Sequence, residues 1–145
     1  MPTIWTIGYE RLLPPQLVAE LEAAGVERVI DVRFRPQSRR PGMSKTRLGT
    51  LLAGRGIAYE HRKALGTPPD LRHDFHAGRL EQARAGYREH VEATAPDELA
   101  ALAGELEHGP RTALLCLEED PAGCHRRVLC EALAERLPRL EVVDL

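Results

Sequence analysis

Short apolar runs alternate along the chain with longer segments in which apolar residues recur every three or four positions. The short runs predict strands at residues 3–7, 28–32, 57–60, 112–117 and 140–143. The longer segments predict helices that follow Pro14-Pro15, Ser44, Pro96-Asp97 and Asp120-Pro121, with a further one over Leu80–Val91. Because strands and helices alternate, the strands are expected to be parallel and to be joined by crossover helices.

The run from Thr112 to Leu117 is apolar at nearly every position, which is typical of a strand buried on both faces and predicts a central place in the sheet. Residues 65–78 contain Gly-Thr-Pro-Pro and scattered polar side chains, and we expect a long surface loop there. These elements together predict one α/β domain over residues 1–145. It would have three layers and a mostly parallel sheet, in a Rossmann-like or flavodoxin-like arrangement.

Composition indicates the class of protein and the compartment in which it is expected. Hydrophobic residues make up 43% of the chain and charged residues 29%, as in ordinary globular proteins. No apolar run approaches the roughly 20 residues that span a bilayer, and the amino terminus lacks the pattern of a secretion signal, so no membrane association is expected. The three cysteines show no paired spacing, which suits a reducing compartment, and we expect a cytoplasmic protein.

Positive charge is concentrated in one segment although the net charge is −2. Between residues 28 and 47 Asp31 is the only acid, and it stands against the basic residues Arg28, Arg33, Arg35, Arg39, Arg40, Lys45 and Arg47. Such a patch either binds phosphate groups or forms a solvated surface. Aromatic residues are only 4% of the chain, which leaves few side chains on which nucleic-acid bases can stack.

Polar or special residues follow at once after four of the predicted strands. They are Gly8-Tyr9-Glu10, Arg33-Phe34-Arg35, His61-Arg62 and Glu118-Glu119-Asp120. Loops are commonly polar, but in parallel sheets ligands bind outside the carboxyl ends of the strands, where these segments converge. We therefore expect a site for a small anionic ligand there, with Gly8, Tyr9, Arg33, Ser38, Arg39, His61 and Arg126 as its binding residues.

Cys124-His125-Arg126 lies in the first turn of the helix predicted after Asp120-Pro121, where free N–H groups favour an anion or a thiolate. Arg126 is suited to hold a phosphate or carboxylate, and His125 is suited to move a proton. Cys124 fits two interpretations, a nucleophile or a small buried residue. Successive helical side chains point about 100° apart, so at most two of the three face one ligand unless the turn is irregular.

Among the remaining polar residues, Glu118 is the candidate general acid or base, because partial burial at a crevice raises the pKa of a carboxyl group. Asp31 shares a strand face with Arg33, and we expect the two to pair. Cys116 and Cys130 are expected in the core. A metal site built from Cys116, Cys124 and either His125 or His61 stays open, although no Cys-x-x-Cys pair supports it, and the sequence indicates no particular cofactor.

Read in order, four motifs resemble the family known as domain of unknown function 488. They are Thr6-Ile7-Gly8-Tyr9, Asp31-Val32-Arg33 with Pro36 and Ser38, Tyr59-Glu60-His61 with Leu65-Gly66, and Cys116-Leu117-Glu118 with Cys124-His125-Arg126. The resemblance covers essentially the whole chain and implies a compact bacterial or archaeal α/β protein, without a settled activity, substrate or cofactor. Tyr9 stands where members frequently have His, which removes a possible base, and Thr67 stands where many have a second Gly.

Three hypotheses follow. The first is an enzyme or sensor for a small phosphorylated or nucleotide-like ligand held by Arg33, Arg39 and Arg126, with Glu118 and His125 nearest the chemistry. The second is a nucleic-acid-binding module that uses the Arg28–Arg47 patch. The third is a thiol or metal-binding protein built on Cys124. The oligomeric state is not indicated.

Overall fold

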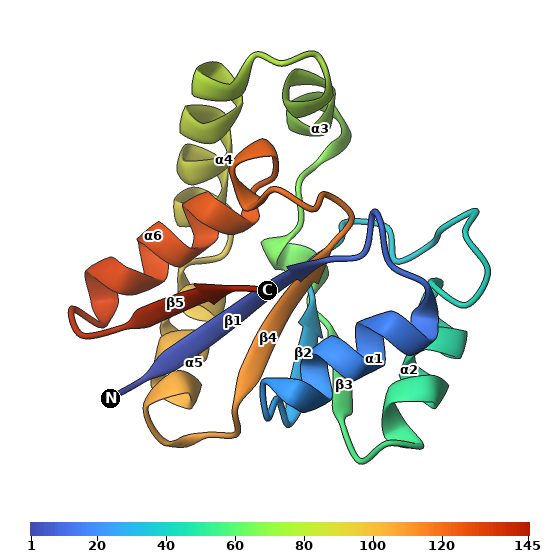
Figure 1. Cartoon of the computed structure of the whole chain (residues 1–145). Helices are drawn as coiled ribbons and strands as arrows, with labels where there is room; N and C mark the ends of the chain where they lie inside the picture. The colour runs from blue at the N-terminus through green and yellow to red at the C-terminus, as the bar shows by residue number, and fades with distance from the viewer.

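A computed structural model describes residues 1–145 as a five-stranded sheet, parallel throughout, between two layers of helices (Figure 1). The strands are β1 (Thr3–Gly8), β2 (Arg28–Asp31), β3 (Ala58–His61), β4 (Thr112–Cys116) and β5 (Glu141–Asp144). The helices are α1 (Pro14–Ala23), α2 (Lys45–Ala53), α3 (Pro69–His76), α4 (Leu80–Thr94), α5 (Pro96–His108) and α6 (Arg126–Arg136), with short 3₁₀ turns at Lys63–Leu65 and Pro121–Gly123. The prediction of a three-layer α/β fold is confirmed, and no helix is long and apolar enough to cross a membrane.

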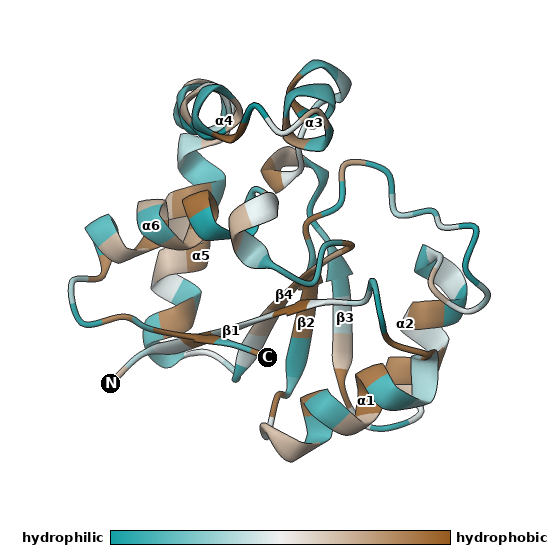
Figure 2. Cartoon of the chain, turned by 45° about the horizontal axis from the view of Figure 1, so that its top comes forward, coloured by the Kyte–Doolittle hydropathy of each residue, from teal (hydrophilic) through white to brown (hydrophobic).

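The layers follow from the apolar pattern of the strands. Alternate strand residues such as Ile7 and Leu115 pack against α1 and α2 in one core, whereas Ile30 and Leu114 pack against α4, α5 and α6 in the other. Every residue of β4 is buried, as its continuous apolar run predicts, and Figure 2 colours stretches of β2 and β4 as hydrophobic. β4 therefore lies at the centre of the sheet, as predicted.

The strand order, β3-β2-β4-β1-β5, is what assembles the site. The connection through α1 carries the chain from β1 past the place of β4 to β2, and β4 later fills that gap. In register, Gly8 of β1 lies beside Cys116 and Asp31 of β2 lies beside Leu115, so the three strands end at nearly the same level. Loops that are far apart in sequence thus meet over one edge, as expected where connections diverge in an open parallel sheet.

Two expectations about the segments at this edge are wrong. Residues 65–78 do not form a loop throughout, because α3 begins at Pro69, buries Phe75 and lies above the carboxyl edge of the sheet (Figure 1). A proline in the first turn and apolar side chains four residues apart, Leu71 and Phe75, are the signals for this helix. The helix expected from Asp120-Pro121 begins only at Arg126. Residues 121–123 form a 3₁₀ turn that Asp120 caps by accepting from the Ala122 N–H at 2.9 Å.

A buried ion pair holds the end of β2. Asp31, which is fully buried, accepts from Arg33 Nε at 2.9 Å and from the Arg33 terminal nitrogen at 2.7 Å. The remaining Arg33 nitrogen donates to the Met43 carbonyl at 2.7 Å and to the Tyr9 hydroxyl at 3.2 Å, and Tyr59 O–H donates to Asp31. The predicted pairing of Asp31 with Arg33 is confirmed.

We expect Asp31→Asn to lower the free energy of unfolding by about 3–5 kcal/mol, because it leaves the buried Arg33 guanidinium without a countercharge. Urea denaturation measures the loss. Glu22→Gln is the matched control, since Glu22 pairs with Arg55 at 2.9 Å on the surface, where an ion pair contributes about 1 kcal/mol or less. Equal losses in the two variants would contradict the structural role given to Asp31.

Candidate functional site

A small cavity of about 40 Å³ lies over the carboxyl edge, between the loops that follow β1, β2 and β4. Its wall includes Tyr9, Arg33, Cys116, Glu118, Cys124 and His125. This volume holds a few water-sized groups, since one water needs roughly 10–15 Å³ by this measure. As it stands, the cavity admits a small reacting group and excludes a nucleotide.

An irregular turn places Cys124 and His125 on the same side of the chain. Cys124 is extended, with φ −141° and ψ 166°, whereas His125 has helical angles and directly precedes α6. As a result Cys124 Sγ lies 3.5 Å from His125 Nδ1. The regular helical spacing assumed for these residues would have pointed the two side chains about 100° apart.

His125 has a defined orientation because both ring nitrogens have neighbours. Nε2 lies 2.8 Å from the Val32 carbonyl, and since a carbonyl only accepts, Nε2 carries the proton. Nδ1 is thereby left to face the Cys124 sulfur. The ring packs against Tyr87 with 5.0 Å between ring centroids and is 3% exposed, so the imidazole is held firmly in place.

Cys116 brings a second thiol to this point from the end of β4. Cys116 Sγ, Cys124 Sγ and His125 Nδ1 all lie within 4.8 Å of one another. Cys116 Sγ also donates to Glu118 Oε2 at 3.6 Å. Cys116 is buried, as expected of a core residue, but it also lines the cavity, a role that its place in a strand did not suggest.

The two thiols differ in acidity. Burial by itself raises the pKa of Cys124, but the hydrogen bond from Cys116 and the neighbouring His125 outweigh burial and hold that pKa well below its usual range. The bond to Cys124, followed by burial, raises the pKa of Cys116 well above its usual range. Burial, followed by the negative charge of Cys124, raises the pKa of Glu118, as predicted for a carboxyl at this crevice. These contacts thus favour the ionised form of Cys124 and the neutral form of Cys116.

Gly8 and Arg126 support the loop that carries Glu118. A Cβ atom on Gly8 would lie 1.7 Å from the Glu118 carbonyl oxygen, so no larger residue fits without moving the loop. The Arg126 guanidinium donates to the same carbonyl and is 1% exposed, while its Nε has no partner. Both residues therefore shape the site from outside the cavity wall.

The structure brings only some of the sequence candidates to the cavity. Tyr9, Arg33, Glu118, Cys124 and His125 line it, although the Arg33 donors are occupied by Asp31, Tyr9 and Met43. Ser38 and Arg39 lie in a separate groove along residues 36–47, where Ser38 Oγ accepts from the Arg40 N–H at 3.1 Å. His61 Nε2 lies 2.7 Å from the Arg33 carbonyl, so His61 contacts the loop after β2 from outside the cavity wall.

Four residues of the wall belong to the segment for which a loop is predicted: Thr67, Arg72, Phe75 and His76. His76 Nε2 lies 3.5 Å from Glu118 Oε1, so the end of α3 contacts the candidate acid. The periodic spacing of Leu71 and Phe75 could have revealed the helix. No local signal shows that the helix lies over β4, because that position depends on long-range packing.

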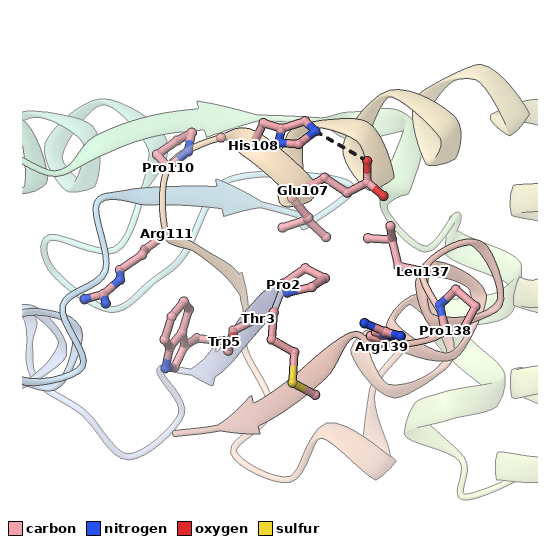
Figure 3. A pocket seen from close by; sticks show the side chains of 13 residues that line it. Pro2, Thr3, Trp5, Glu107, His108, Pro110, Arg111, Leu137, Pro138 and Arg139 are labelled. Atoms are coloured by element: carbon pink, nitrogen blue, oxygen red, sulfur yellow. Dashed lines mark ion pairs between the residues drawn. The ribbon is translucent and has the colours of Figure 1, made fainter.

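A larger hollow, of about 740 Å³, lies at the opposite, amino-terminal edge of the sheet (Figure 3). Its labelled side chains include Trp5, Arg111 and Arg139, and its one ion pair, between His108 and Glu107, spans 3.8 Å on the surface. It holds no thiol, and its charged side chains, Glu107, His108, Arg111 and Arg139, are all exposed. We therefore choose the smaller cavity as the candidate functional site, because its wall carries the thiols and the imidazole.

Cys116, Cys124 and His125 also form a set of donors that one cation could share. Zn²⁺ takes thiolate and imidazole ligands, and a histidine that binds metal commonly donates its other ring N–H to a backbone carbonyl, as His125 does to Val32. The fourth donor within reach is Glu118, through its contact with Cys116.

Fold and site together define an α/β protein with two thiols and an imidazole at the carboxyl edge of a parallel sheet. The chain belongs to the family described as Domain of unknown function DUF488, whose model matches residues 14–133, and the suspected resemblance is thereby confirmed. Comparisons with curated proteins and with solved structures found no match.

We expect the rate at which iodoacetamide alkylates Cys124 to fall less steeply with decreasing pH than the rate for free cysteine, because the lowered pKa of Cys124 keeps it a thiolate below the usual thiol pKa. Burial raises the pKa of Cys130 to about 12, so Cys130 should stay unmodified and serves as the internal control. Peptide mass spectrometry measures both rates. A rate at Cys124 that climbs about tenfold per pH unit, as for an ordinary thiol, would contradict the thiolate assignment.

Gly8→Ala should lower the free energy of unfolding by about 1–3 kcal/mol and slow the alkylation of Cys124, because the new methyl displaces the Glu118 carbonyl. Thermal unfolding and the alkylation rate are the two measurements. Gly104→Ala is the control: a Cβ there meets nothing within 4 Å on α5, so the variant should gain about 0.5–1 kcal/mol and react normally. A Gly8→Ala protein that behaves in the same way would refute the close approach.

Proposed function

We propose that this protein is a thiol redox enzyme in which Cys124 is the attacking thiolate and Cys116 is the resolving thiol. The observation that carries the proposal is the meeting of both sulfurs with His125 Nδ1, within 4.8 Å, beneath a small cavity. It is the third of the hypotheses drawn from the sequence, in the form in which Cys116 is the partner of Cys124. The oxidant is a hydroperoxide, whose reacting group fits the volume of the cavity.

The first step is nucleophilic attack. The Cys124 thiolate attacks the terminal oxygen of the hydroperoxide, the O–O bond breaks, and the leaving alkoxide takes up a proton to become an alcohol. Cys124 becomes a sulfenic acid. His125 Nδ1 faces the sulfur, so it takes the Cys124 proton before the attack and then, as imidazolium, gives that proton to the leaving alkoxide.

The second step forms a disulfide. Cys116 gives its proton to Glu118, attacks Cys124 and displaces hydroxide, which takes that proton and leaves as water. The two sulfurs have then lost two electrons to the peroxide, and an external thiol returns the protein to the dithiol state. Glu118 suits the transfer because it accepts from Cys116 at 3.6 Å, and its raised pKa makes it a stronger base than a surface carboxylate.

The other two hypotheses have less support. A ligand held by Arg33 would have to displace Asp31, and a nucleotide exceeds the cavity. For nucleic-acid binding, the favourable observation is that Arg35, Arg39 and Arg47 are exposed and form no ion pair. Binding of a mixed oligonucleotide pool that weakens as salt rises would support that alternative.

Hydrogen peroxide titration tests the proposal. We expect wild-type protein to form a Cys116–Cys124 disulfide, detected by peptide mass spectrometry as a linked pair lighter by two hydrogen atoms. Cys116→Ser should stop at the sulfenic acid on Cys124, which dimedone traps, and Cys124→Ser should react at neither position. Cys130→Ser is the matched control, because Cys130 is equally buried but is not part of the cluster, and it should behave as the wild type does.

Two outcomes would overturn the proposal. One is oxidation of wild-type protein without a link between Cys116 and Cys124. The other is stoichiometric zinc in the purified protein that blocks both thiols until it is removed, which would favour a metal centre instead.

A further inference from the structure

A second hollow, of about 310 Å³, opens directly outside the cavity that holds Cys124. It shares five wall residues with that cavity: Phe34, Arg35, Thr67, Arg72 and His76. Pro69 and His73 complete it, so only Phe34 contributes a large apolar side chain. The shared residues make the two spaces neighbours, and we call the outer one the vestibule.

The vestibule carries unneutralised positive charge. Arg35 and Arg72 are exposed, and neither guanidinium forms a hydrogen bond or an ion pair. Of the two acids on α3, Asp74 pairs with Arg79 at 2.9 Å, and Asp70 forms no ion pair with Arg72 and is not part of the vestibule wall. Most other arginines are held by carboxylates or carbonyls, as Arg40 and Arg126 are, so Arg35 and Arg72 belong to the minority whose guanidinium groups are free to bind an anion.

Thr67 supplies an independent sign that a polar group binds here. Its hydroxyl is buried, with the residue 5% exposed, and it has no hydrogen-bond partner. It lies where the cavity and the vestibule join, because it belongs to the wall of both. A buried hydroxyl without a partner is unfavourable by about 1–3 kcal/mol, a cost that a bound acceptor would remove.

We infer that the vestibule is an anion subsite, which holds a carboxylate or phosphate group of the substrate while its electrophilic end reaches Cys124. Arg35 and Arg72 supply the charge and Thr67 supplies a directed hydrogen bond. The inference rests on the proposed function and narrows its substrate class to hydroperoxides that carry an anionic group. A volume of about 310 Å³ accommodates a small organic anion.

Two alkylating reagents of equal size test the charge preference. Iodoacetate is an anion and iodoacetamide is neutral, so the ratio of their rate constants at Cys124, divided by the same ratio for free cysteine, isolates the effect of charge. We expect this normalised ratio to be well above one in the wild type and to fall about two- to five-fold in Arg72→Ala or Arg35→Ala. It should also fall in Thr67→Val and at high salt.

Arg47→Ala is the matched control, because it removes an exposed arginine of α2 that does not line the vestibule, and it should leave the ratio unchanged. A wild-type ratio equal to that of free cysteine, with normal reaction of iodoacetamide, would overturn the anion subsite and leave the thiolate intact.

Inorganic phosphate tests the subsite without any reaction at Cys124. Millimolar phosphate should raise the thermal midpoint of the wild type and of Arg47→Ala, but not that of Arg72→Ala or Thr67→Val. Loss of all Cys124 alkylation together with this phosphate pattern would refute the thiol chemistry and retain the subsite. Equal stabilisation of all four proteins, or of none, would refute the subsite.

Discussion

The Asp31 carboxylate is the constraint on which the carboxyl edge depends. It is fully buried at the end of β2, and its partners are the backbone N–H and guanidinium of Arg33 and the hydroxyl of Tyr59. Val32 lies between the two members of this ion pair, and its carbonyl accepts from His125. A charge buried in one strand thus sets the position of the imidazole, and through it the position of Cys124, which follows a different strand.

Most of the arginines here serve the architecture. Arg40 donates to the carbonyls of Tyr9 and Leu12, Arg126 donates to that of Glu118, and Arg28 donates to Thr112 and Glu105. A guanidinium has five donors and can bond to several loops at once. These side chains therefore hold the loops together where no hydrogen bonds of a helix or sheet do so. Because so many arginines have structural roles, the basic segment in the sequence did not by itself locate an anion site.

The parts of the structure that depend on local pattern were predictable from the sequence. The strand period placed Asp31 and Arg33 on one face, and the continuous apolar run of β4 placed that strand in the centre. The site depended on two features without a local pattern. One is the irregular turn that makes Cys124 and His125 face each other, and the other is α3, whose place above the sheet comes from packing between distant segments. A meeting of Cys116 with Cys124 was one of the alternatives left open by the sequence, but their actual contact depends on the irregular turn and has no local signal.

Cys124 and His125 are neighbours in the chain, whereas Cys116 belongs to the most deeply buried strand. Contact within the first pair is a matter of two residues' backbone angles, and it persists through any local opening that leaves those angles unchanged. Contact with Cys116 depends instead on the 3₁₀ turn at residues 121–123, which contacts β1 and α6. In the proposed cycle, opening of that turn would separate the two sulfurs and delay the disulfide, and by removing the hydrogen bond that lowers the pKa of Cys124 it would slow the first oxidation as well.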